Sequence, residues 1–212
     1  VTFAGRKATV QYENDQDRWR RQAMTGWALP NVELRVVDAE LHDVPRDMET
    51  MGEIIVRGDH VMEGYYDDDS GTRAVMEDGW LHTGDMAVWD AEGYVLIVDR
   101  KKEIIISGGE NISSLEIEKA VASHPEVYEC AVVAAPDEKW GETPAAVVYR
   151  KPGSELTAEE LGTYLAERLS RFKLPRIIEF VEEPLPKGGT GKVRKLQLKE
   201  RYWAGKEKRV QG

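Results

Sequence analysis

Four short segments hold the residues whose types and spacing could carry chemistry. They lie at residues 52–58, 79–85, 99–112 and 185–195, and each joins glycines to charged or hydroxyl side chains. Glycines that bracket an apolar run, as in the first segment, more often mark turns than a site. Each segment alone is explained more readily by structure than by function, and only their order along the chain makes them specific.

The second segment reads Gly-Trp-Leu-His-Thr-Gly-Asp and ends at Asp85. A carboxylate just past a glycine turn can accept hydrogen bonds from both hydroxyls of a ribose, and its charge makes these bonds stronger than neutral ones. The simpler interpretation is a turn aspartate that caps its own backbone. Residue type alone favours that simpler interpretation.

The third segment contains three consecutive isoleucines and then Gly108 and Gly109. Two adjacent glycines let a backbone approach a ligand with no Cβ in the way. A strand followed by an ordinary loop is the simpler alternative. The charged stretch at residues 99–103 lies where the pattern of the chain changes, and we expect a hinge there.

The fourth segment is rich in glycine and contains Lys192. It fails as a Walker phosphate loop, because Pro186 stands at the required first glycine and Val193 at the required Ser or Thr. What remains is a glycine loop whose lysine could enter a site, neutralise phosphate charge and leave again. A flexible surface loop is the simpler alternative.

Composition excludes several classes of protein. The chain has 212 residues, of which 32% are charged and 41% hydrophobic, as expected of a globular protein. It has no apolar run near the roughly 20 residues of a membrane-spanning helix, and its net charge of −10 argues against a nucleic-acid partner. Residues 187–209 nevertheless carry nine Lys or Arg and two Glu, which suits a phosphate-bearing ligand or, more simply, a solvated basic tail.

The cysteine and histidine content predicts neither a disulfide nor a metal site. Cys130 is the only cysteine and lies in an apolar run, so we expect a buried structural thiol and a reducing, cytoplasmic compartment. The four histidines are dispersed without metal-ligand spacing, and no zinc or other protein-bound metal is expected.

Hydrophobic periodicity predicts an α+β chain in two parts. Residues 1–30 are polar and irregular, and we expect a solvated segment. Strands are expected at residues 32–36, 53–57, 86–89 and 94–99, with a hairpin at 90–93, which suggests a small β-barrel or sandwich. Beyond residue 102, capping boxes at Ser113 and Thr157 open two helices, and strands are expected at residues 130–135, 145–149 and 177–181. This second part is predicted to be a compact mixed α+β unit.

Taken in order, the four segments resemble the adenylate-forming superfamily, which includes acyl-CoA synthetases, firefly luciferases and peptide-synthetase adenylation domains. The resemblance covers residues from about 26 to 202. Trp-Leu-His-Thr-Gly-Asp ending at Asp85 is similar to the ribose-binding motif of that family, and Arg100 follows fifteen residues later, where the family places a second ribose contact. Lys192 matches the catalytic lysine of the family's C-terminal motif. The sequence around Gly108 and Gly109 resembles that of fatty-acyl-CoA ligases more than that of peptide synthetases.

The resemblance implies a role for each matching residue. Asp85 and Arg100 would bind the ribose of ATP, and Lys192 would bridge the carboxylate and the α-phosphate during adenylation. Lys102 would be the hinge between the C-terminal part of a large N-terminal domain, residues 1–101, and a C-terminal lid domain, residues 102–212.

In the second lid orientation of the family, the loop that includes Gly108, Gly109 and Glu110 would line the tunnel for the pantetheine thiol. Ser107 stands where some relatives have a basic residue, and Lys139, Lys173 or Arg176 could substitute for it at a coenzyme A phosphate.

The implied function is that of an AMP-forming acyl-CoA synthetase, with ATP, Mg²⁺ and coenzyme A as cofactors and a fatty or related acid as substrate. The expected partners are small molecules, and assembly into a homo-oligomer is left as an open alternative. Family members are over twice as long, with the phosphate loop, acyl pocket and magnesium motif upstream of the matched region. We therefore expect the 212 residues alone to be inactive. Two alternatives stay open: an acyl-AMP ligase that loads a carrier protein, and a non-catalytic truncated paralogue acting as a binding module.

Overall fold

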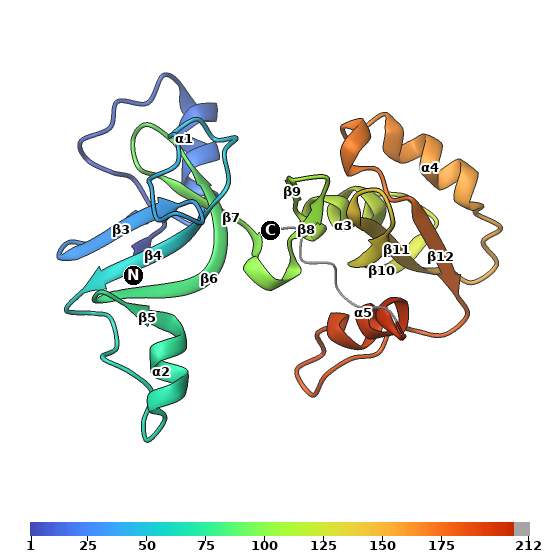
Figure 1. Cartoon of the computed structure of the whole chain (residues 1–212). Helices are drawn as coiled ribbons and strands as arrows, with labels where there is room; N and C mark the ends of the chain where they lie inside the picture. Colours follow the sequence, from blue (N-terminus) through green and yellow to red (C-terminus); the bar gives the residue numbers. More distant parts are fainter. Residues whose placement is uncertain (206–212) are drawn as a thin grey trace. The chain divides into compact units, whose positions relative to one another are not determined.

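The computed structural model describes residues 1–205, which fall into two compact units. The first unit is Val1–Lys102, and the second begins at Glu103. The sequence predicts this join one residue earlier, between residues 101 and 102. Each unit has hydrophobic cores made of its own residues (Figure 1).

An antiparallel sheet forms the centre of the first unit. Its strands are β3 (Val32–Val37), β4 (Gly52–Gly58), β5 (Met76–Glu77), β6 (Trp80–Trp89) and β7 (Val95–Arg100). β3 pairs with β4, β4 with β6, and β6 with both β5 and β7. The four strands expected here are confirmed, and so is the α+β class. Among the described strands the sheet is open and not closed into a barrel.

β6 is longer than expected because it begins at Trp80 and includes the whole Trp-Leu-His-Thr-Gly-Asp motif. The hairpin that follows it has the expected turn, in which Asp90 N–H donates to the Tyr94 carbonyl. Alternate residues along the sheet, among them Val36, Ile54 and Ala87, are buried in one core. The motif that ends at Asp85 therefore lies on β6, at a place where the pairing of β6 with β4 changes register.

The N-terminal segment is more ordered than the sequence predicts. β1 (Thr2–Phe3) pairs with β2 (Trp27–Ala28), and α1 (Asp15–Gln22) begins after Asn14, whose side chain accepts the Asp17 N–H. The helix buries none of its residues, so it leaves no apolar periodicity in the sequence. A second short helix, α2 (Asp69–Val75), connects β4 to β5.

The second unit is a mixed sheet with helices on its two faces. Its strands are β8 (Ile105–Ser107), β9 (Glu110–Ile112), β10 (Val127–Asp137), β11 (Gly141–Arg150) and β12 (Ile177–Val181). Its helices are α3 (Ser114–Ala122), α4 (Ala158–Ala166) and α5 (Lys195–Trp203). The strand order is β10-β11-β8-β9, and β12 lies parallel to β11. The strands and helices expected in this part are confirmed, and the β8–β9 hairpin and α5 are additional.

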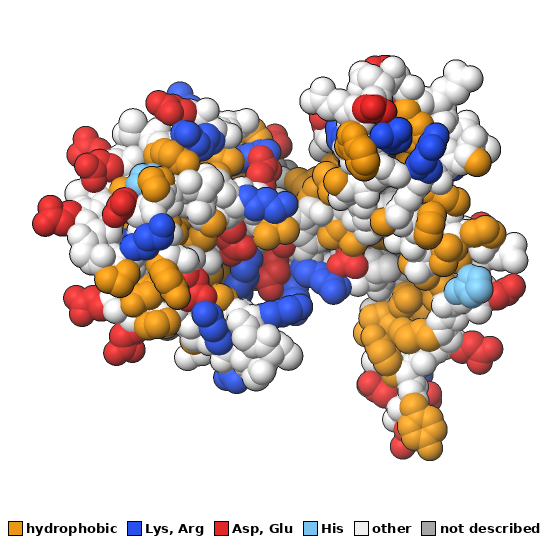
Figure 2. Space-filling model, turned by 180° about the vertical axis from the view of Figure 1, so that it is seen from behind, with side chains coloured by type: hydrophobic (Ala, Val, Ile, Leu, Met, Phe, Trp, Pro, Cys, Tyr) orange, Lys and Arg blue, Asp and Glu red, His pale blue; other side chains and the backbone are white. Residues whose placement is uncertain are grey.

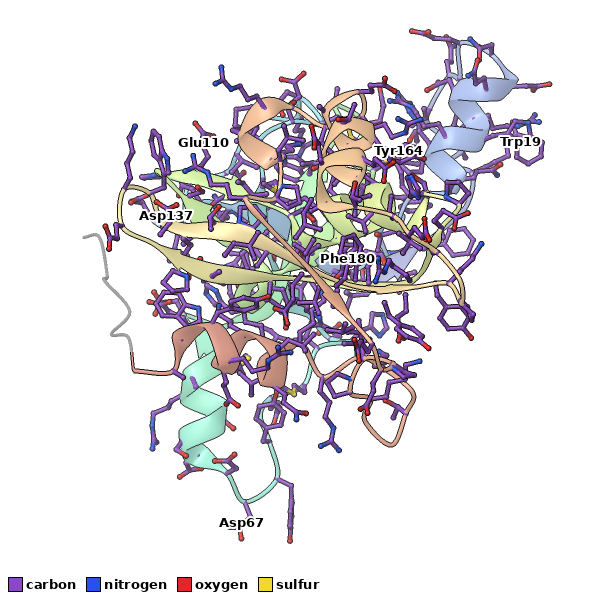
Figure 3. The ribbon with its side chains drawn as sticks, turned by 90° about the vertical axis from the view of Figure 1, so that its right-hand side faces the viewer. Trp19, Asp67, Glu110, Asp137, Tyr164 and Phe180 are labelled. Carbon is purple, nitrogen blue, oxygen red and sulfur yellow. The ribbon has the colours of Figure 1, made fainter. Side chains whose placement is uncertain are left out.

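β10 and β11 are apolar on both faces because both faces are covered. Val132 and Val148 pack into a core with α3 and α4, whereas Val133 and Val147 pack into another with Leu198 of α5. Figure 3 shows α4, which carries the labelled Tyr164, on one side of this sheet and α5 on the other. The continuous apolar runs of the sequence follow from this double covering.

Both expected helix caps are present. Ser113 accepts the Glu116 N–H at the start of α3, and Thr157 and Glu160 form the full reciprocal box at the start of α4. Each cap satisfies backbone donors that lack a partner within the helix.

Candidate functional site

Asp85 and Arg100 are brought together by the pairing of β6 and β7. They are register partners, and Arg100 Nη1 lies 2.9 Å from Asp85 Oδ1. The Asp85 side chain keeps 21% of its surface exposed and that of Arg100 keeps 59%, so a ligand can reach both. A partly exposed carboxylate braced by a guanidinium is a charged acceptor that suits a sugar diol.

The backbone before Asp85 is fixed from the neighbouring strand. Thr83 Oγ1 donates to the Ile54 carbonyl at 2.8 Å and accepts the Asp85 N–H at 3.1 Å. Gly84 has a φ of +69°, in the left-handed region that favours glycine. The glycine and threonine of the motif therefore have structural roles that direct the carboxylate of Asp85.

A buried carboxylate with no motif signal in the sequence lies behind this turn. The side chain of Glu53 on β4 is only 7% exposed. It contacts His82 Nδ1 at 2.9 Å and Lys101 Nζ at 2.9 Å, and it accepts the Gly84 N–H at 3.1 Å. Burial raises the pKa of Glu53, but the hydrogen bonds from His82 and Lys101 together lower it by more than burial raises it. The net pKa therefore lies below its ordinary value.

A hollow of about 760 Å³ opens beside the same turn. Glu53, His82, Thr83, Gly84 and Lys101 line it on the side of the motif. The remaining wall is formed by the segment after β3 and by the region from α2 to β5. The motif turn thus borders a polar cavity within the first unit.

Gly108 and Gly109 form the two-residue turn of the β8–β9 hairpin. Their φ angles are +61° and +89°, as in the type I′ turns that favour glycine at both positions. A Cβ on Gly108 would lie 2.5 Å from a ring carbon of Trp140, whereas a Cβ on Gly109 would meet nothing within 4 Å. Glu110 follows as an exposed residue at the start of β9 (Figure 3).

The Trp140 carbonyl accepts the Gly108 N–H at 2.9 Å, which fastens this turn to the β10–β11 hairpin. The Lys139 ammonium and the Arg176 guanidinium lie 4.6 and 5.6 Å from the Trp140 ring. Lys173, the third cation considered for a phosphate contact, is instead paired with Glu116 at 2.7 Å. The structure therefore places two of these three cations beside Gly108 through Trp140.

Lys192 lies in a closed turn between β12 and α5. The Gly188 N–H donates to the Lys192 carbonyl at 2.8 Å, and Lys187 and Val193 form a bridge at its base. Lys187 is paired with Glu129, and Lys195 with Glu118. Within the described part of the chain, no ion pair involves the side chain of Lys192. Lys206, Lys208 and Arg209 of the basic segment lie outside the described residues.

Lys102 is the last residue of the first unit and lies in a short 3₁₀ turn, Lys101–Glu103. Asp85 and Arg100 belong to the first unit, whereas Gly108, Gly109, Glu110 and Lys192 belong to the second. The sequence-predicted site residues thus form three local groups. These are the ion pair of β6 and β7, the β8–β9 turn and the lysine loop.

Residues 1–205 contain no cluster of three or more His, Cys, Asp or Glu side chains that could hold a metal ion. Within the same residues, no helix is both long and apolar enough to cross a membrane. On the face seen in Figure 2, Lys and Arg side chains are interspersed with Asp and Glu.

The chain matches two family profiles in succession. Residues 5–66 match the AMP-binding enzyme, and residues 116–192 match the AMP-binding enzyme C-terminal domain. The chain belongs to the family of AMP-binding enzymes, and it corresponds to their C-terminal portion.

Proteins named as CoA ligases are among its relatives. The chain is 46% identical to a peroxisomal trans-cinnamate:CoA ligase of Petunia hybrida, over 85% of this chain and 31% of that protein. It is 42% identical to a long-chain-fatty-acid–CoA ligase of Thermus thermophilus, over 92% of this chain and 36% of that protein. The chain thus spans about a third of the length of these relatives.

The solved structures that resemble the chain are adenylate-forming enzymes. The crystal structure of ATP-bound MatB from Rhodopseudomonas palustris superimposes with a TM-score of 0.74 at 36% identity. That match covers 84% of this chain and 35% of the MatB chain.

Proposed function

We propose that this chain is the C-terminal part of an AMP-forming acyl-CoA synthetase. The whole protein would activate a carboxylic acid with ATP as an acyl adenylate and pass the acyl group to coenzyme A. The observation that carries the proposal is the Asp85–Arg100 pair, which presents an accessible charged acceptor on a family motif. The names of the relatives support CoA as the acceptor.

Asp85 would accept hydrogen bonds from the ribose hydroxyls of ATP, with Arg100 fixing the direction of its carboxylate. The ion pair matters because a free, partly exposed carboxylate can rotate, whereas a paired one presents its remaining lone pairs in a set direction. The exposed fraction of both side chains leaves room for the sugar.

Lys192 would neutralise charge on the α-phosphate and the attacking carboxylate during adenylation. Its side chain suits this role because no carboxylate among residues 1–205 forms an ion pair with it, unlike Lys187 and Lys195. Mg²⁺ bound to ATP would supply further charge neutralisation. Its protein ligands would belong to the magnesium motif that family members have upstream of the matched region.

Gly108, Gly109 and Glu110 would line the path of the pantetheine thiol in the second half-reaction. The β8–β9 turn suits this role because it has no Cβ at its tip and is fastened to Trp140. Lys102 would be the hinge between residues 1–101 and the lid domain, residues 102–212.

The substrate proposed is a fatty or related carboxylic acid. The relatives named above act, by their names, on cinnamate and on long-chain fatty acids. The proposed compartment is the cytoplasm, on the evidence of the single reduced Cys130; the peroxisome of the Petunia relative is the alternative that a fluorescent fusion would reveal.

Two half-reactions test the proposal in the full-length protein. Lys192→Ala should lose ATP–pyrophosphate exchange but still convert supplied acyl adenylate to acyl-CoA. Gly109→Leu should do the reverse, because its side chain would fill the tip of the turn. Loss of the same half-reaction in both variants would contradict the two assignments.

Two further measurements test the alternative functions. A comparison of free CoA with a holo-carrier protein as acceptors distinguishes the synthetase from a carrier-loading ligase. Absence of pyrophosphate exchange in the unmodified protein would favour a binding module.

A further inference from the structure

Donors from two separate stretches of chain converge on the carboxylate of Glu53. Oε1 accepts the Gly84 N–H at 3.1 Å, and Oε2 lies 2.9 Å from His82 Nδ1 and 2.9 Å from Lys101 Nζ. His82 and Gly84 belong to β6, 29 and 31 residues along the chain, and Lys101 lies 48 residues along. One side chain on β4 therefore connects the motif turn to the residue before the expected hinge.

The burial of Glu53 makes these contacts necessary. A carboxylate taken out of water costs several kcal/mol unless a charge partner and hydrogen bonds offset that cost. The Glu53 side chain is 7% exposed, whereas that of Lys101 is 63% exposed. The lysine thus reaches from the surface to a buried anion, which places the backbone of residue 101 relative to β4.

The two anchored stretches each adjoin one member of the proposed nucleotide pair. Gly84 precedes Asp85, and Lys101 follows Arg100. Because Asp85 and Arg100 are register partners on β6 and β7, a shift of either neighbour would change their 2.9 Å contact.

We propose that Glu53 is the positioning residue of the nucleotide-binding pair: its carboxylate holds Gly84 and Lys101 and so fixes Asp85 and Arg100. This proposal rests on the proposed function of Asp85. Glu53 itself does not touch the nucleotide. It sets the direction of the acceptor and the start of the turn that leads to Lys102.

Thr83 provides only part of this positioning. Its hydroxyl links the Asp85 N–H to the Ile54 carbonyl, so it fixes the backbone of the motif against β4. The Thr83 hydroxyl does not contact Lys101, although the Thr83 carbonyl accepts a hydrogen bond of 3.5 Å from Arg100 Nη1. To this contact and to the strand pairing of Asp85 with Arg100, Glu53 adds a buried connection from Gly84 to Lys101.

The test uses the full-length protein and Glu53→Gln. The amide can still accept from Gly84, but its nitrogen cannot accept from Lys101 or His82. We expect the KM for ATP to rise on the order of tenfold, with the KM for the carboxylic acid unchanged. ATP affinity measured by calorimetry should fall by a similar factor. A purely structural role would lower stability without singling out ATP.

Glu33→Gln is the matched control. Glu33 lies on the adjacent strand β3 and forms an exposed ion pair with Arg57 at 2.8 Å, away from Asp85. The Glu33→Gln variant loses the same charge from the same sheet, and its KM for ATP should equal that of the unmodified protein. An equal rise in the control, or a folded Glu53→Gln with unchanged KM for ATP and unchanged ATP affinity, overturns the proposal.

Lys101→Met covers the case in which Glu53→Gln does not fold. Lys101 is mostly exposed, and its loss removes one donor from Glu53 while two remain. ATP affinity should again fall selectively, and unchanged affinity overturns the proposal. In the double variant, the two effects should be less than additive, because both act through one contact. If the proposed function itself is wrong, the unmodified protein will neither exchange pyrophosphate nor bind ATP. That result is distinct from failure of the Glu53 proposal, in which the unmodified protein does both.

Discussion

The indole of Trp140 lies against Gly108, so closely that a Cβ at position 108 would be 2.5 Å from its ring. Gly108 also has a φ of +61°, and its N–H donates to the Trp140 carbonyl. The hairpin turn is therefore closed by a contact that only glycine permits. Gly109, its neighbour, has a positive φ but open space around it.

The two glycines make a matched pair for a stability measurement. Gly108→Ala should lower the free energy of unfolding by about 2–3 kcal/mol, from left-handed strain together with the clash on Trp140. Gly109→Ala should cost only the strain, about 1–2 kcal/mol. Urea unfolding followed by tryptophan fluorescence measures both. Equal losses would show that Trp140 moves aside freely.

Acid should remove the contribution of Glu53 to stability. Its folded-state pKa lies below the ordinary value of 4.5, so the ionised form is the one that the fold favours. That contribution is fully present above about pH 4.5 and is lost as the pH falls through the lower folded-state pKa. The stability difference between the unmodified protein and Glu53→Gln should therefore shrink below pH 4.5. Denaturant curves between pH 7 and 3 measure it, and a difference that grows with acid would contradict the assignment.

Cys130 should be inert in the folded protein. Burial, reinforced by the negative charge of Glu118, raises the pKa of its thiol to about 12, so almost no thiolate exists at pH 8. Iodoacetamide should label it slowly in buffer and rapidly in denaturant, as mass spectrometry would show. Fast labelling in buffer, at the rate of a small free thiol, would mean that β10 opens readily.

Substitution of Lys195 should lower stability, whereas substitution of Lys192 should abolish activity. The Lys195 ammonium lies 2.8 Å from Glu118 and 2.9 Å from the Ser114 hydroxyl, and both members of the ion pair are largely buried. Lys195→Met should lower the free energy of unfolding by about 2 kcal/mol, because it leaves Glu118 without its charge partner.

Lys192→Met makes the same change of charge three residues earlier and should leave stability unchanged within about 0.5 kcal/mol. It should abolish adenylation instead. Thermal unfolding and pyrophosphate exchange, measured on both variants, check the two expectations. A Lys192→Met protein that is clearly destabilised would show that this lysine is tied to its own unit.

The elements that the sequence predicts well are those with a local signal. β3 follows from strict alternation, and α4 follows from the capping box at Thr157 and Glu160. α1 was not expected, because it buries no residue and so has no apolar stripe. The sequence predicts a strand and a loop where the structure has the β8–β9 hairpin, although two adjacent glycines are a signal for a type I′ turn.

The candidate site was predicted only where residues form a linear motif. Asp85 and Arg100 could be named because they match motifs of the family that the sequence resembles, and the structure adds that they are in contact. Glu53 could not be named in this way. Its partners lie 29 to 48 residues away, and in the sequence it is one charged residue at the start of a strand. A buried carboxylate is recognised by its donors, and those are brought to it by the pairing of β4 with β6.

Because β10 and β11 are apolar on both faces, a hairpin slipped by one residue would still bury hydrophobic side chains, so hydrophobicity alone selects the correct register weakly. The turn between them selects it more strongly. Asp137 Oδ1 accepts the N–H groups of Lys139 and Trp140, both at 2.9 Å, and only the native pairing places that carboxylate at the start of the turn. Asp137 thus helps the β10–β11 hairpin to form in the correct register during folding. Loss of its side chain should lower the yield of correctly folded protein more than it lowers the stability of the native state.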